Sequence, residues 1–150
     1  MNSIKKRPYL LFLTLIVILL SFGFYKRNET IDINIHDTYF VISWMYALII
    51  ISFIYGLLGL IYFTLLKLKF KLINWVTITH VLVSIIGLFA IFILSKLIRE
   101  SVPGDFTKLI DDIDFNQKIG FGIWFSVFTV IGIQLLFFIN VIYALIKGRF

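Results

Sequence analysis

Residues 39–66 read YFVISWMYALIIISFIYGLLGLIYFTLL and contain no charged side chain. A hydrocarbon core of about 30 Å is crossed by about 20 apolar residues in a helix, and a helix satisfies its own backbone polar groups in lipid. The stretch therefore predicts a membrane-spanning helix. Three other stretches have the same character, and the four predicted spans are Pro8–Tyr25, Tyr39–Leu66, Trp75–Leu97 and Ile119–Ile146.

The composition of the whole chain supports this class. Of its 150 residues, 61% are hydrophobic, compared with about 45–50% in soluble domains. The chain has no cysteine, which excludes disulfides and thiolate metal sites. We therefore predict an all-α fold, an integral membrane bundle of four transmembrane helices. It is divided into an N-terminal anchor with its outer loop, residues 1–38, and a three-helix membrane region, residues 39–150.

Charged residues gather at the ends of the predicted spans. If the chain crosses four times, all eight carboxylates fall on one side of the membrane. The other side receives basic residues alone: Lys5, Lys6, Arg7, Lys67, Lys69, Lys71, Lys147 and Arg149. The positive-inside rule makes this second side the cytoplasm, so both termini are predicted to be cytoplasmic. The basic residues do not share one soluble face, so the net charge of +6 does not indicate a nucleic-acid partner.

The first span allows a second interpretation. A basic start followed by an apolar run is also typical of a secretory signal peptide, with Ser21-Phe22-Gly23 as the cleavage site. The apolar run is longer than the usual 7–15-residue core of such a peptide, and it ends in aromatic residues that suit a membrane interface. We therefore favour an uncleaved anchor. Cleavage would leave three spans in the same orientation.

A family resemblance lies at the start of the second span. The run His36-Asp37-Thr38-Tyr39-Phe40-Val41 resembles the motif that opens the tenth membrane helix in the catalytic subunit I of haem-copper (cytochrome c or quinol) oxidases. Small residues follow at matching offsets, at Ser52, Gly56 and Gly59, and residues 131–142 resemble the last helix of the bacterial subunits. The chain from about Ile33 onward thus resembles helices ten to twelve. The resemblance implies a bacterial inner (cytoplasmic) membrane and respiratory-complex subunits as partners. A homo-oligomer is the alternative, beside the lipid bilayer.

The chain departs from this family at the haem ligands. Trp44 and Tyr46 occupy the positions of the histidine pair, and Arg99 is followed by Glu100 where the family has paired arginines. We therefore predict no oxidase activity and no cofactor. The predicted function is that of a non-catalytic multi-pass membrane protein, a degenerate relative of subunit I that acts through helix contacts. One alternative is a protein that binds haem, metal or quinone through Trp44, Tyr46 and His36. Another is a small transporter, which the lack of charged residues inside the spans disfavours.

Two candidate sites remain. His36 and Asp37 match a pair that contributes to a magnesium site in the oxidases, so the resemblance implies a metal site there. A divalent ion needs more oxygen ligands than this pair offers, and Asp37 could instead cap the second span. The outer loop from Lys96 to Lys118 predicts a short amphipathic helix on the membrane surface, since its apolar residues recur at helical spacing.

Four polar residues inside the spans are predicted to make interhelical hydrogen bonds: Ser52, His80, Gln134 and Asn140. Counting residues from the span ends puts Ser52 and Gln134 in one layer near the midplane. His80 and Asn140 fall in a second layer, each about 9 Å from the cytoplasmic face at 1.5 Å per residue. Such bonds contribute about 0.6–2 kcal/mol each in membranes.

Overall fold

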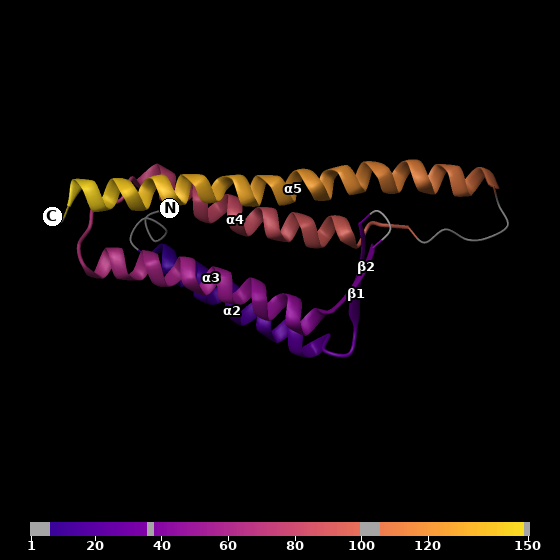
Figure 1. Cartoon of the computed structure of the whole chain (residues 1–150), viewed down its shortest axis with the longest axis horizontal. Coiled ribbons are helices and arrows are strands. Elements are labelled where there is room, and N and C mark those ends of the chain that lie inside the picture. Colours follow the sequence, from indigo (N-terminus) through magenta and orange to yellow (C-terminus); the bar gives the residue numbers. More distant parts are fainter. Residues whose placement is uncertain (1–6, 36–37, 100–105, 149–150) are drawn as a thin grey trace. The chain divides into compact units, whose positions relative to one another are not determined.

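The computed structural model describes residues 7–35, 38–99 and 106–148. Its elements follow in the order α2 (Pro8–Tyr25), β1 (Thr30–Ile35), β2 (Thr38–Ser43), α3 (Trp44–Lys67), α4 (Asn74–Ser95) and α5 (Phe106–Lys147) (Figure 1). Among the described residues, four helices are long and apolar enough to cross a membrane. The prediction of four such helices is therefore confirmed, and α2 has the predicted bounds.

The described chain is mostly helical, as predicted, except between α2 and α3, where β1 and β2 form a two-stranded antiparallel sheet that was not predicted. The register runs from Thr30 opposite Ser43 to Ile35 opposite Thr38. Residues 30–35 read TIDINI, the strict alternation of polar and apolar residues that is typical of a strand. Residues 38–43 read TYFVIS and are rich in β-branched and aromatic residues. Because these residues enter the sheet, α3 begins at Trp44 instead of Tyr39.

A second correction concerns α5. It is one continuous helix of 42 residues, so the predicted surface helix and the predicted fourth span are the same element (Figure 1). Pro8 and Pro103 are the two prolines of the chain, and neither lies within the helix to break it. At 1.5 Å per residue the helix is about 63 Å long, well beyond the about 30 Å of a hydrocarbon core.

The chain divides into two compact units, one with α2, the sheet and α3, the other with α4 and most of α5. The division predicted at residue 38 stays a prediction. Within the first unit, α2 packs along α3. The buried positions of α3 recur every three or four residues, as in packed helix pairs: Leu48, Ser52, Tyr55, Gly59 and Tyr62.

Phe12 is the centre of the contact between α2 and α3. Its side chain is fully buried, and its ring lies 5.6 Å from that of Tyr55 and 6.2 Å from that of Tyr62, centroid to centroid. Gly59 allows this approach, because a Cβ added there would stand 3.3 Å from the Cβ of Phe12. The first unit is thus held by aromatic packing around a small residue.

The end of α3 is a well-defined helix stop. Lys69 has a φ of 60°, in the left-handed region. The N–H of Phe70 bonds to the carbonyl of Leu65 at 2.9 Å, and the N–H of Lys69 bonds to that of Leu66 at 3.1 Å. These two bonds are those of a Schellman motif, which ends a helix and reverses the chain direction.

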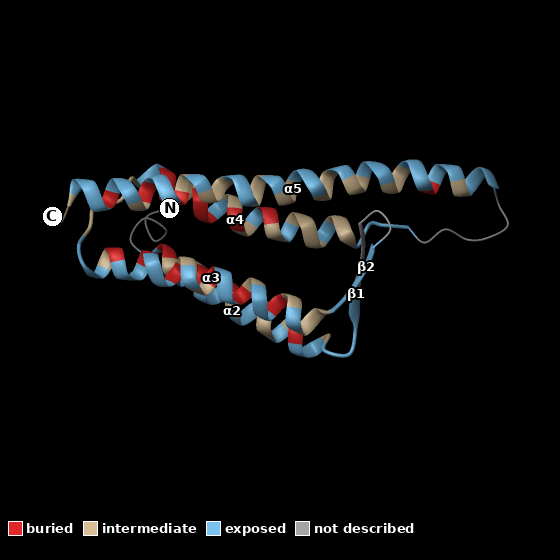
Figure 2. Ribbon diagram, in the orientation of Figure 1, coloured by how far each residue is buried: buried red, intermediate tan, exposed pale blue. Residues whose placement is uncertain are grey.

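Figure 2 shows the burial of each helix, and α5 is pale blue, hence exposed, along most of its length. In the second unit, the contact between α4 and α5 includes Gly87 of α4. A Cβ added at Gly87 would overlap the Cγ2 methyl of Val130 on α5. Near the C-terminal end of α4, a Cβ added at Gly122 of α5 would stand 3.3 Å from the Cδ1 of Leu94. The backbones of α4 and α5 therefore approach closely at small residues, as in other membrane helix pairs.

Candidate functional site: polar contacts between α4 and α5

His80 is the most buried titratable side chain of this contact. It lies on α4 in a buried stripe with Thr77, Ser84 and Gly87 and is fully inaccessible. Its Nε2 lies 3.0 Å from the Oε1 of Gln134 on α5. An amide oxygen only accepts, so this amide assignment places the hydrogen on Nε2, which donates. The imidazole also stacks on Phe137, with 5.1 Å between ring centroids.

Gln134 uses its amide nitrogen as well. The Nε2 donates to the carbonyl of Val130 at 2.9 Å and approaches the Oγ of Ser84 at 3.4 Å. Gln134 therefore joins two positions of α4 one turn apart, His80 and Ser84, to its own helix. This arrangement satisfies the side-chain amide in surroundings where an unpaired polar group would be costly.

A second polar contact lies one layer away, at the first residues of α4. Asn140 is fully buried. Its Oδ1 accepts the backbone N–H of Ile73 at 2.8 Å, and its Nδ2 donates to the Oγ1 of Thr77 at 2.8 Å. The hydroxyl of Thr77 in turn donates to the carbonyl of Ile73 at 3.2 Å. Asn140 thus closes a small ring of hydrogen bonds at the N-terminus of α4, where helix N–H groups lack partners of their own.

The predicted layers differ from these pairs. His80 bonds to Gln134, whereas Asn140 bonds to Thr77. Counting residues from the ends of the spans failed because the helices are offset: Asn140 lies level with Ile73, so α5 continues past the start of α4. Ser52 is buried on α3, and its hydroxyl has no hydrogen-bond partner among the residues that the structure describes.

Thr77 and Ser84 were missed as members of this site. Both lie on the face of α4 that carries His80, at three and four residues from it, which is the spacing of neighbours on one side of a helix. That spacing could have identified them. A hydroxyl in a membrane helix usually bonds to its own backbone, so the sequence did not indicate that Thr77 would also accept a bond from Asn140.

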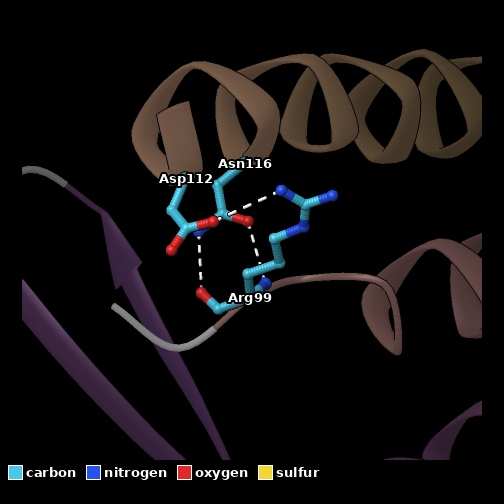
Figure 3. Close-up of polar contacts among 3 residues, drawn as sticks. All are labelled: Arg99, Asp112 and Asn116. Carbon is cyan, nitrogen blue, oxygen red and sulfur yellow. Dashed lines mark hydrogen bonds and ion pairs between the residues drawn. The ribbon is translucent and has the colours of Figure 1, made fainter. Parts of the chain in front are cut away.

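A third polar cluster, also missed, ties Arg99, in the segment that follows α4, to the first turns of α5 (Figure 3). The N–H of Arg99 donates to the Oδ1 of Asn116 at 2.9 Å, and the Nδ2 of Asn116 donates back to the carbonyl of Arg99 at 2.8 Å. The guanidinium donates to Asp112 at 3.3 Å and lies 3.8 Å from the ring centroid of Phe115. Asp112 belongs to the predicted outer loop from Lys96 to Lys118, but it lies in α5 and is buried.

Of the oxidase-like motif, His36 and Asp37 lie outside the described residues, so the metal site stays a prediction. The alternative interpretation, that Asp37 caps the second span, is wrong because Ser43 holds the N-cap position of α3. Trp44 packs edge to face on Phe22, with 5.8 Å between ring centroids, and Tyr46 is 66% exposed. Among residues 7–35, 38–99 and 106–148, no three histidine or acidic side chains lie together as a metal site would require.

Comparisons with models of protein families, with curated proteins and with solved structures find no match to this chain. His80, Gln134, Thr77 and Asn140 are polar groups that bond across two apolar helices. Their chemistry is that of helix association in a medium where polar groups must be paired.

Proposed function

We propose that this chain is a multi-pass integral membrane protein that acts without catalysis, through contacts of its helices in the membrane. The observation that carries the proposal is the use of the polar residues in α4 and α5: His80, Gln134 and Asn140 are bonded between helices. A carrier or pump would need a charged residue on a path through the membrane, and no Asp, Glu, Lys or Arg lies in the core of any predicted span.

The orientation that we propose follows from the charges. The connection between α3 and α4 contains Lys67, Lys69 and Lys71, and Lys147 ends α5, so these regions are cytoplasmic. The sheet and the acidic first turns of α5 then lie on the outer side. Both termini are cytoplasmic, and the membrane is the bacterial inner membrane that the family resemblance implies.

The long apolar surface of α5 supports contact with a partner. Between residues 121 and 145, exposed apolar side chains recur at alternating intervals of three and four residues, at Phe121, Trp124, Phe128, Ile131, Leu135, Phe138, Ile142 and Leu145. Such a stripe suits either lipid or another helix. The resemblance to oxidase subunit I favours subunits of a respiratory complex or a second copy of the chain as the occupant.

The experiment that tests the proposal is purification of the full chain in mild detergent, followed by an absorption spectrum, metal analysis and identification of co-purifying proteins. We expect a colourless sample, without stoichiometric metal, that carries membrane subunits or a second copy of itself. A Soret band or one metal ion per chain would contradict the proposal. Either result would favour a binding site built on His36, Trp44 and Tyr46.

A further inference from the structure

The sheet between α2 and α3 has an apolar surface that the helices of its own unit do not cover. In β2 the exposed fractions are 70% for Tyr39, 46% for Phe40, 63% for Val41 and 37% for Ile42. Figure 2 shows this strand in pale blue. An isolated two-stranded sheet is marginally stable in water, and exposed apolar side chains of this size indicate a contact surface.

The two faces of the sheet are unequal. Phe40 and Ile42 share one face, because side chains of a strand alternate between its two faces. The register sets Ile42 opposite Ile31 on this face, and Ser43 opposite Thr30 on the other. The face of Phe40, Ile42 and Ile31 is therefore apolar, whereas the other face combines Tyr39 and Val41 with the polar Ser43 and Thr30, the pattern of an amphipathic sheet.

The base of the sheet is fixed to the ends of two apolar helices. The hydroxyl of Ser43 donates to the carbonyl of Arg27 at 3.2 Å, and the N–H of Trp44 donates to the carbonyl of Glu29 at 3.1 Å. Glu29 also forms an ion pair with Lys26, and this hydrogen bond raises the pKa of Lys26 above its ordinary value. These bonds hold the sheet where α2 ends and α3 begins.

The direction of the strands relative to α2 and α3 indicates that the sheet lies at a lipid surface and not in open water. Within this unit, β1 and β2 run across the axes of α2 and α3, not along them (Figure 1). If the two helices cross the membrane, a sheet that starts at their ends and runs across their axes lies along the membrane surface. Tyr25, at the end of α2, and Tyr46, in the first turn of α3, are both exposed. The apolar surface of the sheet thus continues an aromatic border of the kind found at membrane interfaces.

We propose that the sheet formed by β1 and β2 lies in the interfacial layer of the outer membrane surface, with Phe40 and Ile42 inserted among the lipids. This rests on the proposed function, since it requires α2 and α3 to cross the membrane. The occupant is the lipid surface, argued from the continuity of the apolar surface with the helix ends and from the direction of the strands. Tyr39 and Val41, on the other face, remain accessible to water.

The test uses the full chain, which contains no cysteine, so that each introduced cysteine takes a single label. Four variants carry an environment-sensitive fluorophore on the sheet, at Tyr39→Cys, Phe40→Cys, Val41→Cys and Ile42→Cys. Each is reconstituted into phosphatidylcholine vesicles containing a fraction of phosphatidylglycerol. Quenching is then measured with aqueous iodide and with nitroxide lipids that carry the quencher at a shallow depth. Ile54→Cys, exposed on α3, serves as the control for membrane insertion.

We expect lipid quenching to alternate along the strand, at least twofold stronger at positions 40 and 42 than at 39 and 41, with iodide quenching in the opposite order. Iodide quenching that is equal at all four positions would overturn the proposal. Protection from both quenchers, with energy transfer between labelled copies, would also overturn it and assign the surface to a second copy. If position 54 is quenched by iodide instead of lipid, the proposed membrane function itself fails.

Discussion

The two helix pairs of this protein are held together by different chemistry. Between α2 and α3, the fully buried Phe12 lies against Tyr55 and Tyr62, and Gly59 makes room for it. Between α4 and α5, His80 and Asn140 are fully buried, and both bond across the helices. In lipid, apolar surface is not driven together by water, so packing and hydrogen bonds decide association. The first pair relies on shape, whereas the second also specifies its register through hydrogen bonds.

The largest effect is expected from Phe12→Ala, which removes the centre of the aromatic contact. Loss of a buried Phe costs about 3–5 kcal/mol in a water-soluble core. In a membrane the unfolded helices keep their apolar surroundings, so we expect about 2–3 kcal/mol, mainly from lost packing. The measurement is reversible unfolding by SDS in mixed micelles, monitored by the fluorescence of Trp44 in a background in which Trp75 and Trp124 are replaced by Phe.

The matched control for Phe12→Ala is Leu13→Ala, the neighbouring residue, which is 53% exposed. We expect its unfolding curve to superimpose on that of the unsubstituted chain within about 0.5 kcal/mol, as for other surface positions. Equal losses for both variants would contradict the contact between α2 and α3 and would indicate a general effect on helix insertion.

The second prediction tests how closely α4 and α5 approach. In Gly87→Ala the new methyl group overlaps Val130, whose branched side chain has little rotamer freedom, and overpacking of this kind costs about 1–3 kcal/mol. Gly132→Ala, on α5, adds the same methyl group with no atom within 4 Å. Energy transfer between dyes on α4 and α5 should decrease in the first variant and stay unchanged in the second.

The third prediction addresses the hydrogen bond between His80 and Gln134. A double-mutant cycle with His80→Phe, Gln134→Leu and the double variant should give a coupling energy of about 0.6–1.7 kcal/mol, the range for interhelical bonds in membranes. Gln117→Leu, an exposed position on α5, provides the control for the Gln→Leu change. Additive effects in the cycle would mean that the two side chains do not interact in the membrane.

The smallest effect is expected for Arg99→Gln, in the cluster of Arg99, Asp112 and Asn116. The side chain of Arg99 is 52% exposed, so Arg99→Gln should cost about 0.5–1 kcal/mol, less in high salt. Asn116→Ala also loses both bonds to the backbone of Arg99 and should cost about 1–2 kcal/mol independently of salt. Hydrogen exchange of the Arg99 amide would report this loss directly. An unchanged exchange rate in Asn116→Ala would show that the cluster does not hold the chain.

The sequence predicted which segments form helices better than it predicted which residues of those helices contact each other. The lengths of the apolar runs identified all four helices, and α2 agrees to the residue. The sheet was missed because residues 39–43 belong to the uncharged apolar run that continues to Leu66 and were assigned to the helix with it, although residues 30–35 alternate as a strand does. The continuity of α5 was missed because the polar and acidic residues before Ile119 suggested a boundary, while no proline enforces one.

The candidate site shows the same limit. His80, Gln134 and Asn140 could be identified as polar residues within apolar helices, but their pairing depends on the offset between α4 and α5, which the sequence does not encode locally. The bond from Asn140 to the N–H of Ile73 is the clearest case, since it involves a backbone group that sequence patterns cannot reveal. The cluster of Arg99 likewise uses main-chain atoms for two of its bonds.

The measurement that tests the central claim most directly is the accessibility of single cysteines in sealed vesicles or cells, with a label that does not cross the membrane. The positions are Lys67→Cys and Lys147→Cys at the proposed cytoplasmic ends, and Arg27→Cys and Gln117→Cys at the proposed outer ends. A four-span protein with cytoplasmic termini should be labelled from outside at positions 27 and 117 alone. Labelling of 27 and 67 from the same side would contradict the account, because α3 would then not cross the membrane.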